Sequence, residues 1–170
     1  MNIETYIRDI PNFPKEGVIF KDITPLLNDA QARKEVVNRF IKHLHDAKID
    51  KVIGVESRGF FFGIMLAEAL GVGFVPVRKK GKLPFDTISA SYELEYGTDI
   101  LEIHTDAIQK GENILIHDDV LATGGTIKAV CELVEKLGGN IVQINFLMEL
   151  EFLNGKEKIK DFNTHSILKY

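Results

Sequence analysis

The chain contains one cysteine, only short hydrophobic runs and no excess of positive charge. The single cysteine, Cys131, cannot form an intramolecular disulfide, which argues against a disulfide-stabilised secreted domain. The longest apolar stretches are far shorter than the about 20 residues that a membrane-spanning helix requires. Because the N-terminus is polar and carries no signal-like segment, we expect a cytoplasmic protein without membrane association.

The charge balance argues against a general affinity for nucleic acids. There are 21 Lys and Arg residues against 25 Asp and Glu residues, which gives a net charge of -4. No nucleic-acid partner is therefore expected, and an anionic ligand has to be bound by a local cluster of donors. With 45% hydrophobic residues over 170 positions, the chain is expected to form a single domain, 1–170, around one sizeable core.

The histidines show no spacing that is typical of a metal site. None of the five belongs to an HExxH or Cys/His pattern. His43 and His45 are two residues apart in a predicted helix, so their side chains face different sides of it. A zinc site is therefore not expected.

Helix and strand patterns alternate through the middle of the chain. Apolar residues at helical spacing predict helices over residues 29–46, 58–70 and 129–137. Short apolar runs predict strands over residues 51–56, 72–77, 113–117 and 141–148, and a hairpin over residues 88–104. This alternation predicts an α/β fold whose central twisted sheet is mostly parallel and is flanked by helices.

Proline and glycine mark two special segments. Pro76 indicates that the strand over residues 72–77 is an edge strand or is ending there. The following segment, RKKGKLPFD over residues 78–86, is basic and contains glycine and proline, so we expect a mobile loop. A solvated basic loop without a function is the alternative for any one of its cations.

Two segments follow predicted strands at the edge of the sheet where ligands bind, ESRGF over residues 56–60 and DDVLATGGT over residues 118–126. In the second, the small residues Ala122 to Thr126 allow consecutive N–H groups to point inward at the start of a helix, which suits a phosphate. Thr123 and Thr126 add hydroxyl donors. The alternative is an ordinary strand-to-helix turn with a threonine cap.

Three familiar motifs are absent from the sequence. There is no GxxxxGK[ST] sequence of a Walker loop. The run from Gly71 to Pro76 begins like GxGxxG but ends in proline, so the dinucleotide fingerprint fails. A nucleophile elbow around Ser57 would need glycine at position 55, where the chain has valine, so a serine hydrolase is not expected.

Asp118 and Asp119 lie directly before the glycine-rich segment. Two ionised carboxylates about 4 Å apart repel by about 1 to 4 kcal/mol, so they require hydroxyl donors or a divalent cation as partners. A ligand with a phosphate for the glycines and two adjacent hydroxyls for the carboxylates is a sugar phosphate, most simply a ribose 5-phosphate group. The alternative is a solvated Asp pair that caps the next turn.

The acidic pair followed by VLATGG resembles the phosphoribosyl pyrophosphate motif of the type I phosphoribosyltransferases. Further blocks resemble the adenine phosphoribosyltransferase family within that group, and they extend over nearly the whole chain. These blocks are NFPKEGVIFKDITPLL (12–27), GVESRGFFFG (54–63), VPVRKKGKLP (75–84) and SYELEYGTDILEIHTDAI (91–108).

The resemblance implies a type I phosphoribosyltransferase fold and a reaction. The segments would be a small N-terminal hood that binds the base (1–28), a lid loop with a catalytic hairpin (78–96) and the phosphoribosyl-binding motif (114–127). Members of the family transfer the 5-phosphoribosyl group from phosphoribosyl pyrophosphate to adenine, releasing pyrophosphate and forming AMP in purine salvage. A homodimer is implied, as is Mg²⁺ bound mainly through the substrate, without confident direct protein ligands.

The resemblance also implies roles for individual residues. The 5-phosphate would bind to Ala122, Thr123, Gly124, Gly125 and Thr126, and the ribose hydroxyls to Asp118 and Asp119. Pyrophosphate would bind near Ser57, Arg58, Arg78, Lys79 and Lys82. The implied catalytic residues are Glu95, which would handle a proton of the base, its neighbour Tyr96, and Arg58, which would help the leaving group depart. The Glu56–Ser57 peptide bond is expected to be cis.

Adenine would be bound by the hood and by the residue after the acidic pair. Phe20 would stack on one face of the ring and Val120 would pack on the other, while backbone groups of Ile19 and Lys21 read its amino edge. Lys21 departs from the arginine often found at this position, which a backbone role tolerates. His117 stands where relatives usually have an apolar residue, and we interpret it as a core residue rather than a catalyst.

Two other functions remain open at this stage. One is a regulator of transcription that binds phosphoribosyl pyrophosphate without catalysis. Against it, a chain of 170 residues with a net charge of -4 is expected to leave no room for an added helix-turn-helix domain. The other is a transferase for hypoxanthine or xanthine, against which only the family blocks argue. Without the resemblance, Glu95 would be interpreted as a solvated side chain.

Overall fold

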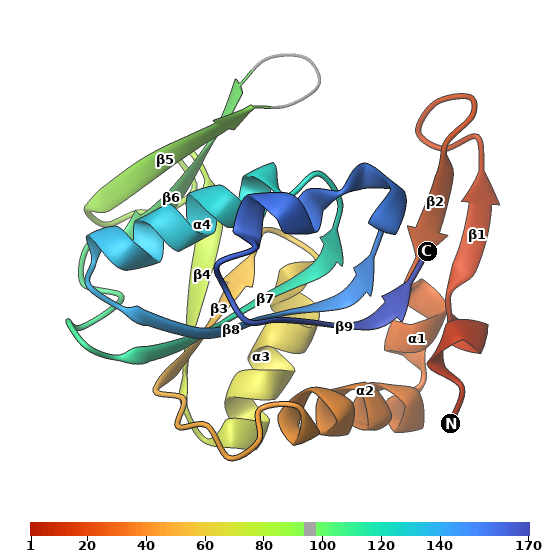
Figure 1. The fold of residues 1–170 in the computed structure, drawn as a ribbon, viewed down its shortest axis with the longest axis horizontal. Coiled ribbons are helices and arrows are strands. Elements are labelled where there is room, and N and C mark those ends of the chain that lie inside the picture. The colour runs from red at the N-terminus through yellow and green to blue at the C-terminus, as the bar shows by residue number, and fades with distance from the viewer. Residues whose placement is uncertain (94–97) are drawn as a thin grey trace.

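A computed structural model describes residues 1–93 and 98–170, apart from the side chain of residue 93, as a sheet with helices on both faces and a separate N-terminal hairpin (Figure 1). The strands are β1 (Arg8–Pro11), β2 (Ile19–Asp22), β3 (Lys51–Val55), β4 (Gly73–Lys79), β5 (Thr87–Glu93), β6 (Thr98–His104), β7 (Asn113–Leu121), β8 (Asn140–Glu149) and β9 (Thr164–Lys169). The helices are α1 (Thr24–Asn28), α2 (Ala30–Lys42), α3 (Gly59–Leu70) and α4 (Gly125–Lys136), with short 3-10 helices η1 (Ile3–Tyr6), η2 (Glu151–Leu153) and η3 (Gly155–Ile159).

Among the described residues, the main sheet has seven strands in the order β5-β6-β4-β3-β7-β8-β9. The strands from β4 to β9 in this order run parallel, whereas β6 is antiparallel to both β4 and β5. The predicted α/β fold with a mostly parallel sheet is confirmed. β9 was not predicted, because its sequence THSILK is short, only partly buried and without a clear alternation.

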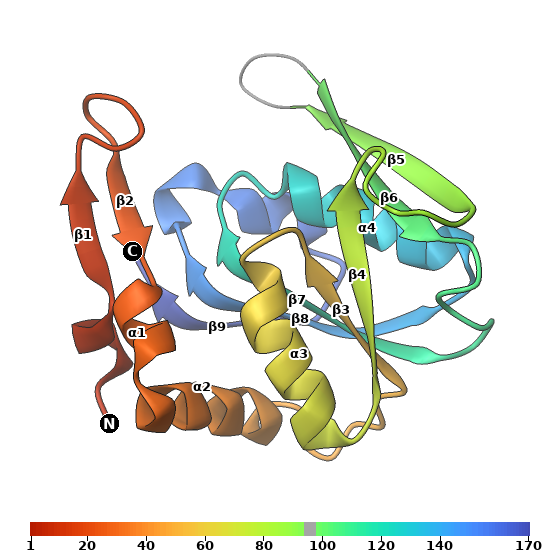
Figure 2. The same cartoon turned by 180° about the vertical axis from the view of Figure 1, so that it is seen from behind.

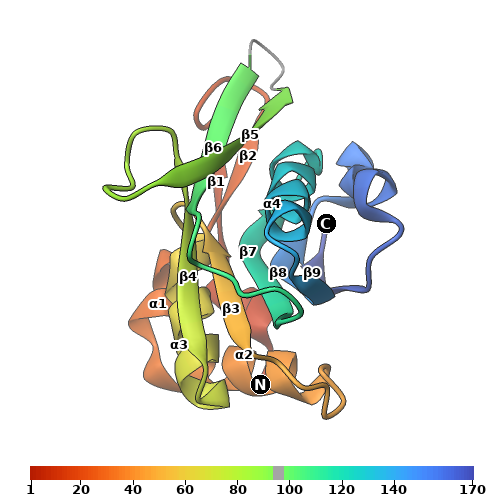
Figure 3. The same cartoon turned by 90° about the vertical axis from the view of Figure 1, so that its left-hand side faces the viewer.

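Helices lie on both faces of the sheet (Figure 3), and apolar side chains fill the space between the helices and the sheet on each face. One core lies under α4 and includes Val130, Leu133 and Phe146. The other lies under α2 and α3 and includes Phe40 and Phe62. The central strands are buried from both sides, which explains their continuous apolar sequences.

The predicted helices form with clear end signals. Asp29 precedes α2, and its side chain accepts a hydrogen bond from the Ala32 N–H at 2.8 Å. Gly71 ends α3 in the left-handed conformation with φ 67°, where glycine is favoured. No described helix has the length and apolar character needed to cross a membrane.

Two predicted loop boundaries are wrong. β7 continues past His117 to Leu121, because β8 pairs with it along this stretch, so Asp118 and Asp119 are strand residues. Likewise, β4 includes Arg78 and Lys79, which pair with Glu102 and Leu101 of β6. Neighbouring strands supply backbone partners that local sequence does not reveal, and they extend both strands into polar sequence.

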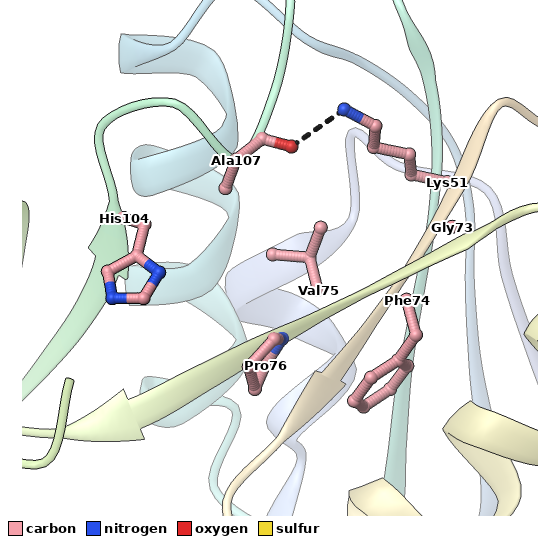
Figure 4. Close-up of a pocket in the computed structure, with 7 residues that line it drawn as sticks. All are labelled: Lys51, Gly73, Phe74, Val75, Pro76, His104 and Ala107. Carbon is pink, nitrogen blue, oxygen red and sulfur yellow. Dashed lines mark hydrogen bonds between the residues drawn. The ribbon is translucent and has the colours of Figure 1, made fainter. Parts of the chain in front are cut away.

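Pro76 does not mark an edge strand, because β4 lies between β3 and β6. However, β6 pairs with β4 only from Arg78 onward, so one side of β4 is open beside Pro76. Figure 4 shows the resulting hollow, where Pro76 and His104 lie on the wall and Lys51 donates to the Ala107 carbonyl oxygen at 2.9 Å. The missing N–H of proline is tolerated where the strand has no second neighbour.

Candidate active site

The two predicted site segments lie side by side at the carboxyl ends of β3 and β7. The Glu56–Ser57 peptide bond between β3 and α3 is cis, as expected. At the start of α3, a Cβ atom on Gly59 would lie 2.9 Å from Asp118 Oδ1 and 3.0 Å from the His117 carbonyl oxygen. Glycine at this position therefore lets α3 approach the acidic pair closely.

The glycine-rich turn after β7 is shaped by a second segment that the sequence did not indicate. Gly124 has φ 78° and precedes α4, and a Cβ atom on it would lie 2.3 Å from the Gly155 carbonyl oxygen. A Cβ atom on Gly155 would lie 2.1 Å from the Ala122 carbonyl oxygen. The two backbones are in direct contact, so η3 supports the turn from behind. The dipeptide Asn154-Gly155 was the only local signal for this contact.

A small cavity of about 60 Å³ lies over this turn. Its wall contains Asp118, Val120, Leu121, Ala122, Thr123, Gly124, Thr126 and Ile127. The first N–H groups of α4 have no partner within the helix and carry the positive end of its dipole. The cavity thus combines an anion-binding helix start with hydroxyl donors and one carboxylate.

The acidic pair is largely removed from water. Asp119 is 5% exposed, and its N–H donates to Asp118 Oδ1 at 2.9 Å. Burial, together with the charge of Asp119, raises the pKa of Asp118 well above its usual range. Burial also raises the pKa of Asp119, although the charge of Arg58 acts in the opposite direction. The pair is therefore short of donors or positive charge, which a bound ligand can provide.

Arg58 connects the acidic pair to the hood. Its Nε lies 2.7 Å from Asp119 Oδ2, and its guanidinium lies 4.8 Å from the centre of the Phe20 ring. Nη1 donates to the Lys21 carbonyl oxygen at 3.4 Å. Arg58 thus brings together three of the segments that the sequence assigned to the site.

Glu56 holds the basic segment against the sheet. Its carboxylate lies 2.7 Å from Lys82 Nζ and 3.4 Å from Arg78 Nη2, and it accepts from the Lys79 N–H at 2.8 Å. Burial raises the pKa of Glu56, but the hydrogen bonds from these three groups outweigh it and keep the pKa below its ordinary value. Glu56 is a functional candidate that the sequence did not single out, because its partners are more than twenty residues away in the chain.

The other predicted cations and Ser57 have separate surroundings. Lys79 Nζ forms an ion pair with Asp99 at 2.9 Å, so it points toward β6 rather than toward Glu56. Ser57 is exposed in the turn between β3 and α3. The Gly81 N–H donates to Glu102 at 2.9 Å, which anchors the segment at a second point.

Among the described residues, no strand pairs with the outer backbone edge of β2 in the hairpin of β1 and β2. Hydrogen-bonded and non-hydrogen-bonded residue pairs alternate along two antiparallel strands. Pro11 lies opposite Ile19 and has no N–H, so this pair is of the non-hydrogen-bonded kind and the next one, Ile10 with Phe20, is hydrogen-bonded. Backbone groups of Ile19 and Lys21 consequently point away from β1. A carbonyl acceptor at Ile19 and an N–H donor at Lys21 lie next to each other on this edge.

Beside this hairpin is an apolar pocket of about 670 Å³. Its wall contains Pro14, Lys15, Gly17, Val18, Ile19, Lys21, Leu150, Phe152, Leu153 and Tyr170. Two of the residues predicted to bind adenine, Ile19 and Lys21, are among them. Phe20 instead packs against Phe13 with ring centres 5.2 Å apart and against Arg58. Leu150 and Tyr170 were missed because they follow β8 and β9, far away in the sequence.

Glu95 and Tyr96, the predicted catalytic pair, lie outside the described residues. The base of their hairpin is held by Tyr92, whose hydroxyl donates to Asp99 at 3.2 Å. Tyr92 also lies beside Gly125 at the start of α4, where both line one hollow. The hairpin therefore lies next to the predicted phosphate-binding segment.

His117 is a core residue that faces away from the site. It is fully buried, and its Nδ1 lies 2.7 Å from Asn145 Oδ1. Burial lowers the pKa of His117 to about 4, so the imidazole is neutral near neutral pH. Successive side chains of a strand alternate between faces, so His117 and Asp118 point in opposite directions.

Within residues 1–93 and 98–170, no three His, Cys, Asp or Glu side chains gather in a way that could hold a metal ion. The two carboxylates of Asp118 and Asp119 still provide the hard oxygen donors that Mg²⁺ prefers. They fit a magnesium ion whose remaining ligands come from substrate oxygens or water, as in many phosphate sites.

Comparison with known proteins places this chain in a family. Residues 26–166 match the model of the phosphoribosyl transferase domain. The chain is 68% identical to an adenine phosphoribosyltransferase of Flavobacterium johnsoniae, with all of both chains covered, and 60% identical to that of Christiangramia forsetii, with 100% of this chain and 99% of the relative covered.

Solved structures agree with the sequence relatives. The adenine phosphoribosyltransferase of Thermoanaerobacter pseudethanolicus has a TM-score of 0.96 at 54% identity, covering 99% of this chain and 98% of the other. That of Saccharomyces cerevisiae, in complex with adenine and an imino-altritol bisphosphate, has a TM-score of 0.93 at 45% identity, covering 96% and 95%. The fold is the type I phosphoribosyltransferase fold, and the chain belongs to the adenine phosphoribosyltransferase family.

Proposed function

We propose that the glycine-rich turn, the acidic pair and the free edge of β2 each bind one part of the two substrates. The activity is that of an adenine phosphoribosyltransferase, a pentosyltransferase that forms AMP and pyrophosphate from adenine and phosphoribosyl pyrophosphate in purine salvage. The observation that carries the proposal is the convergence of Asp119, Arg58 and Lys21, which links the sugar site to the base site.

The ribose phosphate is bound by the segment from Asp118 to Thr126. The 5-phosphate takes the N–H groups at the start of α4 and the hydroxyls of Thr123 and Thr126. The 2- and 3-hydroxyls of the ribose donate to the carboxylates of Asp118 and Asp119, whose raised pKa values reflect their shortage of donors in the free site. Binding therefore stabilises the ionised pair.

Adenine is selected by the backbone of β2. Its 6-amino group donates to the Ile19 carbonyl oxygen, and its ring N1 accepts from the Lys21 N–H. Hypoxanthine and guanine present the reverse pattern, an acceptor at position 6 and a donor at position 1, and would leave both backbone groups unpaired. The Phe20 ring and the Val120 side chain are proposed to pack on the two faces of the base, and Leu150 closes the pocket.

Magnesium is the proposed cofactor, held by substrate oxygens near Asp118 and Asp119. It would neutralise charge on the pyrophosphate. When substrate binds, Arg58 releases its ion pair with Asp119 and binds a pyrophosphate oxygen instead. Ser57 lies beside Arg58 in the same turn. The cations of Arg78, Lys79 and Lys82 add positive charge from β4 and the following loop, which covers the site and excludes water.

Transfer of the ribosyl group develops positive charge at the anomeric carbon. Asp118 and Asp119 place negative charge near the sugar, which stabilises this state. Glu95 is proposed to accept or relay a proton of the adenine ring as the base attacks, with Tyr96 beside it. Substitution Glu95→Ala should therefore lower turnover far more than affinity for phosphoribosyl pyrophosphate, and equal losses in both would remove Glu95 from this role.

The chain is proposed to act as a homodimer in the cytoplasm. Phe61 and Ile64 of α3 are 43% and 51% exposed, and they lie one turn apart on a helix that starts at the site. An exposed apolar pair of this kind is suited to an interface with a second copy. Light scattering at micromolar concentration tests this, and Ile64→Glu should shift a dimer toward the monomer.

One assay tests the function. Purified protein is incubated with phosphoribosyl pyrophosphate and magnesium and with adenine, hypoxanthine, guanine or xanthine in turn, and nucleotide formation is measured. AMP formation from adenine alone is expected. Preference for another base would contradict the β2 assignment, and binding of phosphoribosyl pyrophosphate without turnover on any base would favour a regulatory protein.

A further inference from the structure

β2, the strand that carries the base-reading backbone groups, belongs to a two-stranded sheet that is separate from the main sheet. Its position relative to the sugar site is therefore set by the chain connection to α1 and by side-chain contacts with the body of the protein. On one side, Arg58 contacts Phe20 and the Lys21 carbonyl oxygen. On the other side, Lys21 itself reaches the residue after β9.

The Lys21 ammonium group lies between an aromatic ring and a carboxylate. Its Nζ is 3.8 Å from the centre of the Tyr170 ring and 2.7 Å from Asp9 Oδ1. The side chain of Lys21 is 17% exposed, whereas that of Asp9 is 56% exposed. Because the ammonium group is largely shielded from water, its attraction to the ring face is stronger than at an open surface.

Tyr170 is fixed in the main sheet. Its N–H donates to the Glu149 carbonyl oxygen at 3.0 Å, and its own carbonyl oxygen accepts from the Glu151 N–H at 2.8 Å. Figure 1 and Figure 2 both show the end of β9 beside β2. The ring is thus carried on a rigid element, and it also forms part of the wall of the apolar pocket.

We propose that Tyr170 is a positioning residue for adenine, which holds the Lys21 side chain and thereby fixes the backbone edge of Ile19 and Lys21 over the pocket. This inference rests on the proposed binding of adenine at that edge. Among the contacts from the body to β2, Arg58 holds Phe20 and the Lys21 backbone, and Tyr170 holds the Lys21 side chain. Loss of the contact with Tyr170 lets the hairpin shift while the phosphate-binding turn stays intact.

The test separates the Michaelis constants of the two substrates. Tyr170→Leu removes the ring face but keeps apolar bulk, and it should raise KM for adenine by about 3- to 10-fold, as expected for one cation–π contact. KM for phosphoribosyl pyrophosphate should change by less than about 2-fold, since the substitution does not touch the glycine-rich turn before α4. Tyr170→Phe keeps the ring and should restore the wild-type adenine KM.

A double-mutant cycle distinguishes positioning through Lys21 from direct contact with the base. Lys21→Met should raise the adenine KM by a similar factor, and adding Tyr170→Leu to it should cause little further change. Phe162→Leu is the matched control, because Phe162 is also half-buried but packs in the core under α4, outside the hood and the pocket, and should leave both constants unchanged.

Each outcome decides the proposal. Equal rises in both Michaelis constants of Tyr170→Leu, or additive effects of the two substitutions on the adenine KM, would overturn it. If Tyr170→Leu fails to fold, an unchanged adenine KM in Lys21→Met would overturn it as well. Failure of the wild-type protein to convert adenine would instead refute the proposed function.

Discussion

His117 should make the protein less stable in mild acid by an amount that can be calculated. Its side chain is fully buried, and its pKa of about 4 lies below the value of 6.5 for an unfolded histidine. The unfolded chain therefore binds the proton first as the pH falls. The stabilising contribution is complete above about pH 6.5 and is lost as the pH approaches and passes through about pH 4.

The magnitude follows from the two pKa values. The full difference corresponds to about 3 kcal/mol, and the part lost between about pH 7 and about pH 5 is about 2 kcal/mol of unfolding free energy. His165 also has a pKa lowered to about 4, by burial and then by the charges of His43 and His45. It is present in both proteins of the comparison below, so its contribution cancels.

The assay is urea unfolding at about pH 7 and about pH 5 for the wild type and for His117→Gln. Glutamine does not titrate, and its amide can donate to Asn145 in place of the imidazole. The variant is expected to be less stable than the wild type at about pH 7, but it should lose about 2 kcal/mol less on acidification. The same pH dependence in both proteins would show that His117 does not titrate as a buried neutral group and would refute the reasoning.

Three further outcomes follow from the site. Gly155→Ala should raise KM for phosphoribosyl pyrophosphate by at least about 10-fold, because its Cβ would lie 2.1 Å from the Ala122 carbonyl oxygen. The control is Gly73→Ala, whose Cβ would meet only the Lys51 side chain at 3.6 Å. Equal KM values for phosphoribosyl pyrophosphate in both variants would contradict the support of the turn by η3. Glu56→Gln should speed trypsin cleavage after Lys82, because the ion pair of 2.7 Å is lost; an unchanged cleavage rate would show that Glu56 does not anchor the segment. Removal of magnesium with a chelator should abolish AMP formation and its return should restore it, whereas full activity without the ion would exclude the proposed cofactor.

Local sequence was sufficient for most helices and for the centres of the central strands. The spacing of Val36, Val37 and Phe40 predicts α2, and the buried face of that helix contains these residues. The continuous apolar runs of β3 and β8 predict buried parallel strands. These elements depend on periodicity and end signals within a few residues, which a sequence displays directly.

Strand ends and the second contributors to the site were not predictable in this way. β7 extends through the acidic pair because β8 pairs with it, and β9 forms because β8 offers a partner. Glu56 anchors a loop more than twenty residues ahead, and Gly155 supports a turn about thirty residues behind it. Pairing energy and backbone contact between distant segments decide such features, and neither leaves a local pattern.

The residues proposed to bind the sugar phosphate are contiguous, so the order of Asp118, Asp119 and the glycines was enough to predict a ribose phosphate site and, with the other blocks, to indicate the family. The pocket proposed for the edge of the base is different, because its walls come from β2, from the residues after β8 and from Tyr170. Short-range hydrogen-bonding chemistry can be recognised in a sequence when the donors are neighbours. A pocket assembled across three distant segments exists only after packing brings them together, which is why the hold of Tyr170 on Lys21 emerged from the tertiary structure.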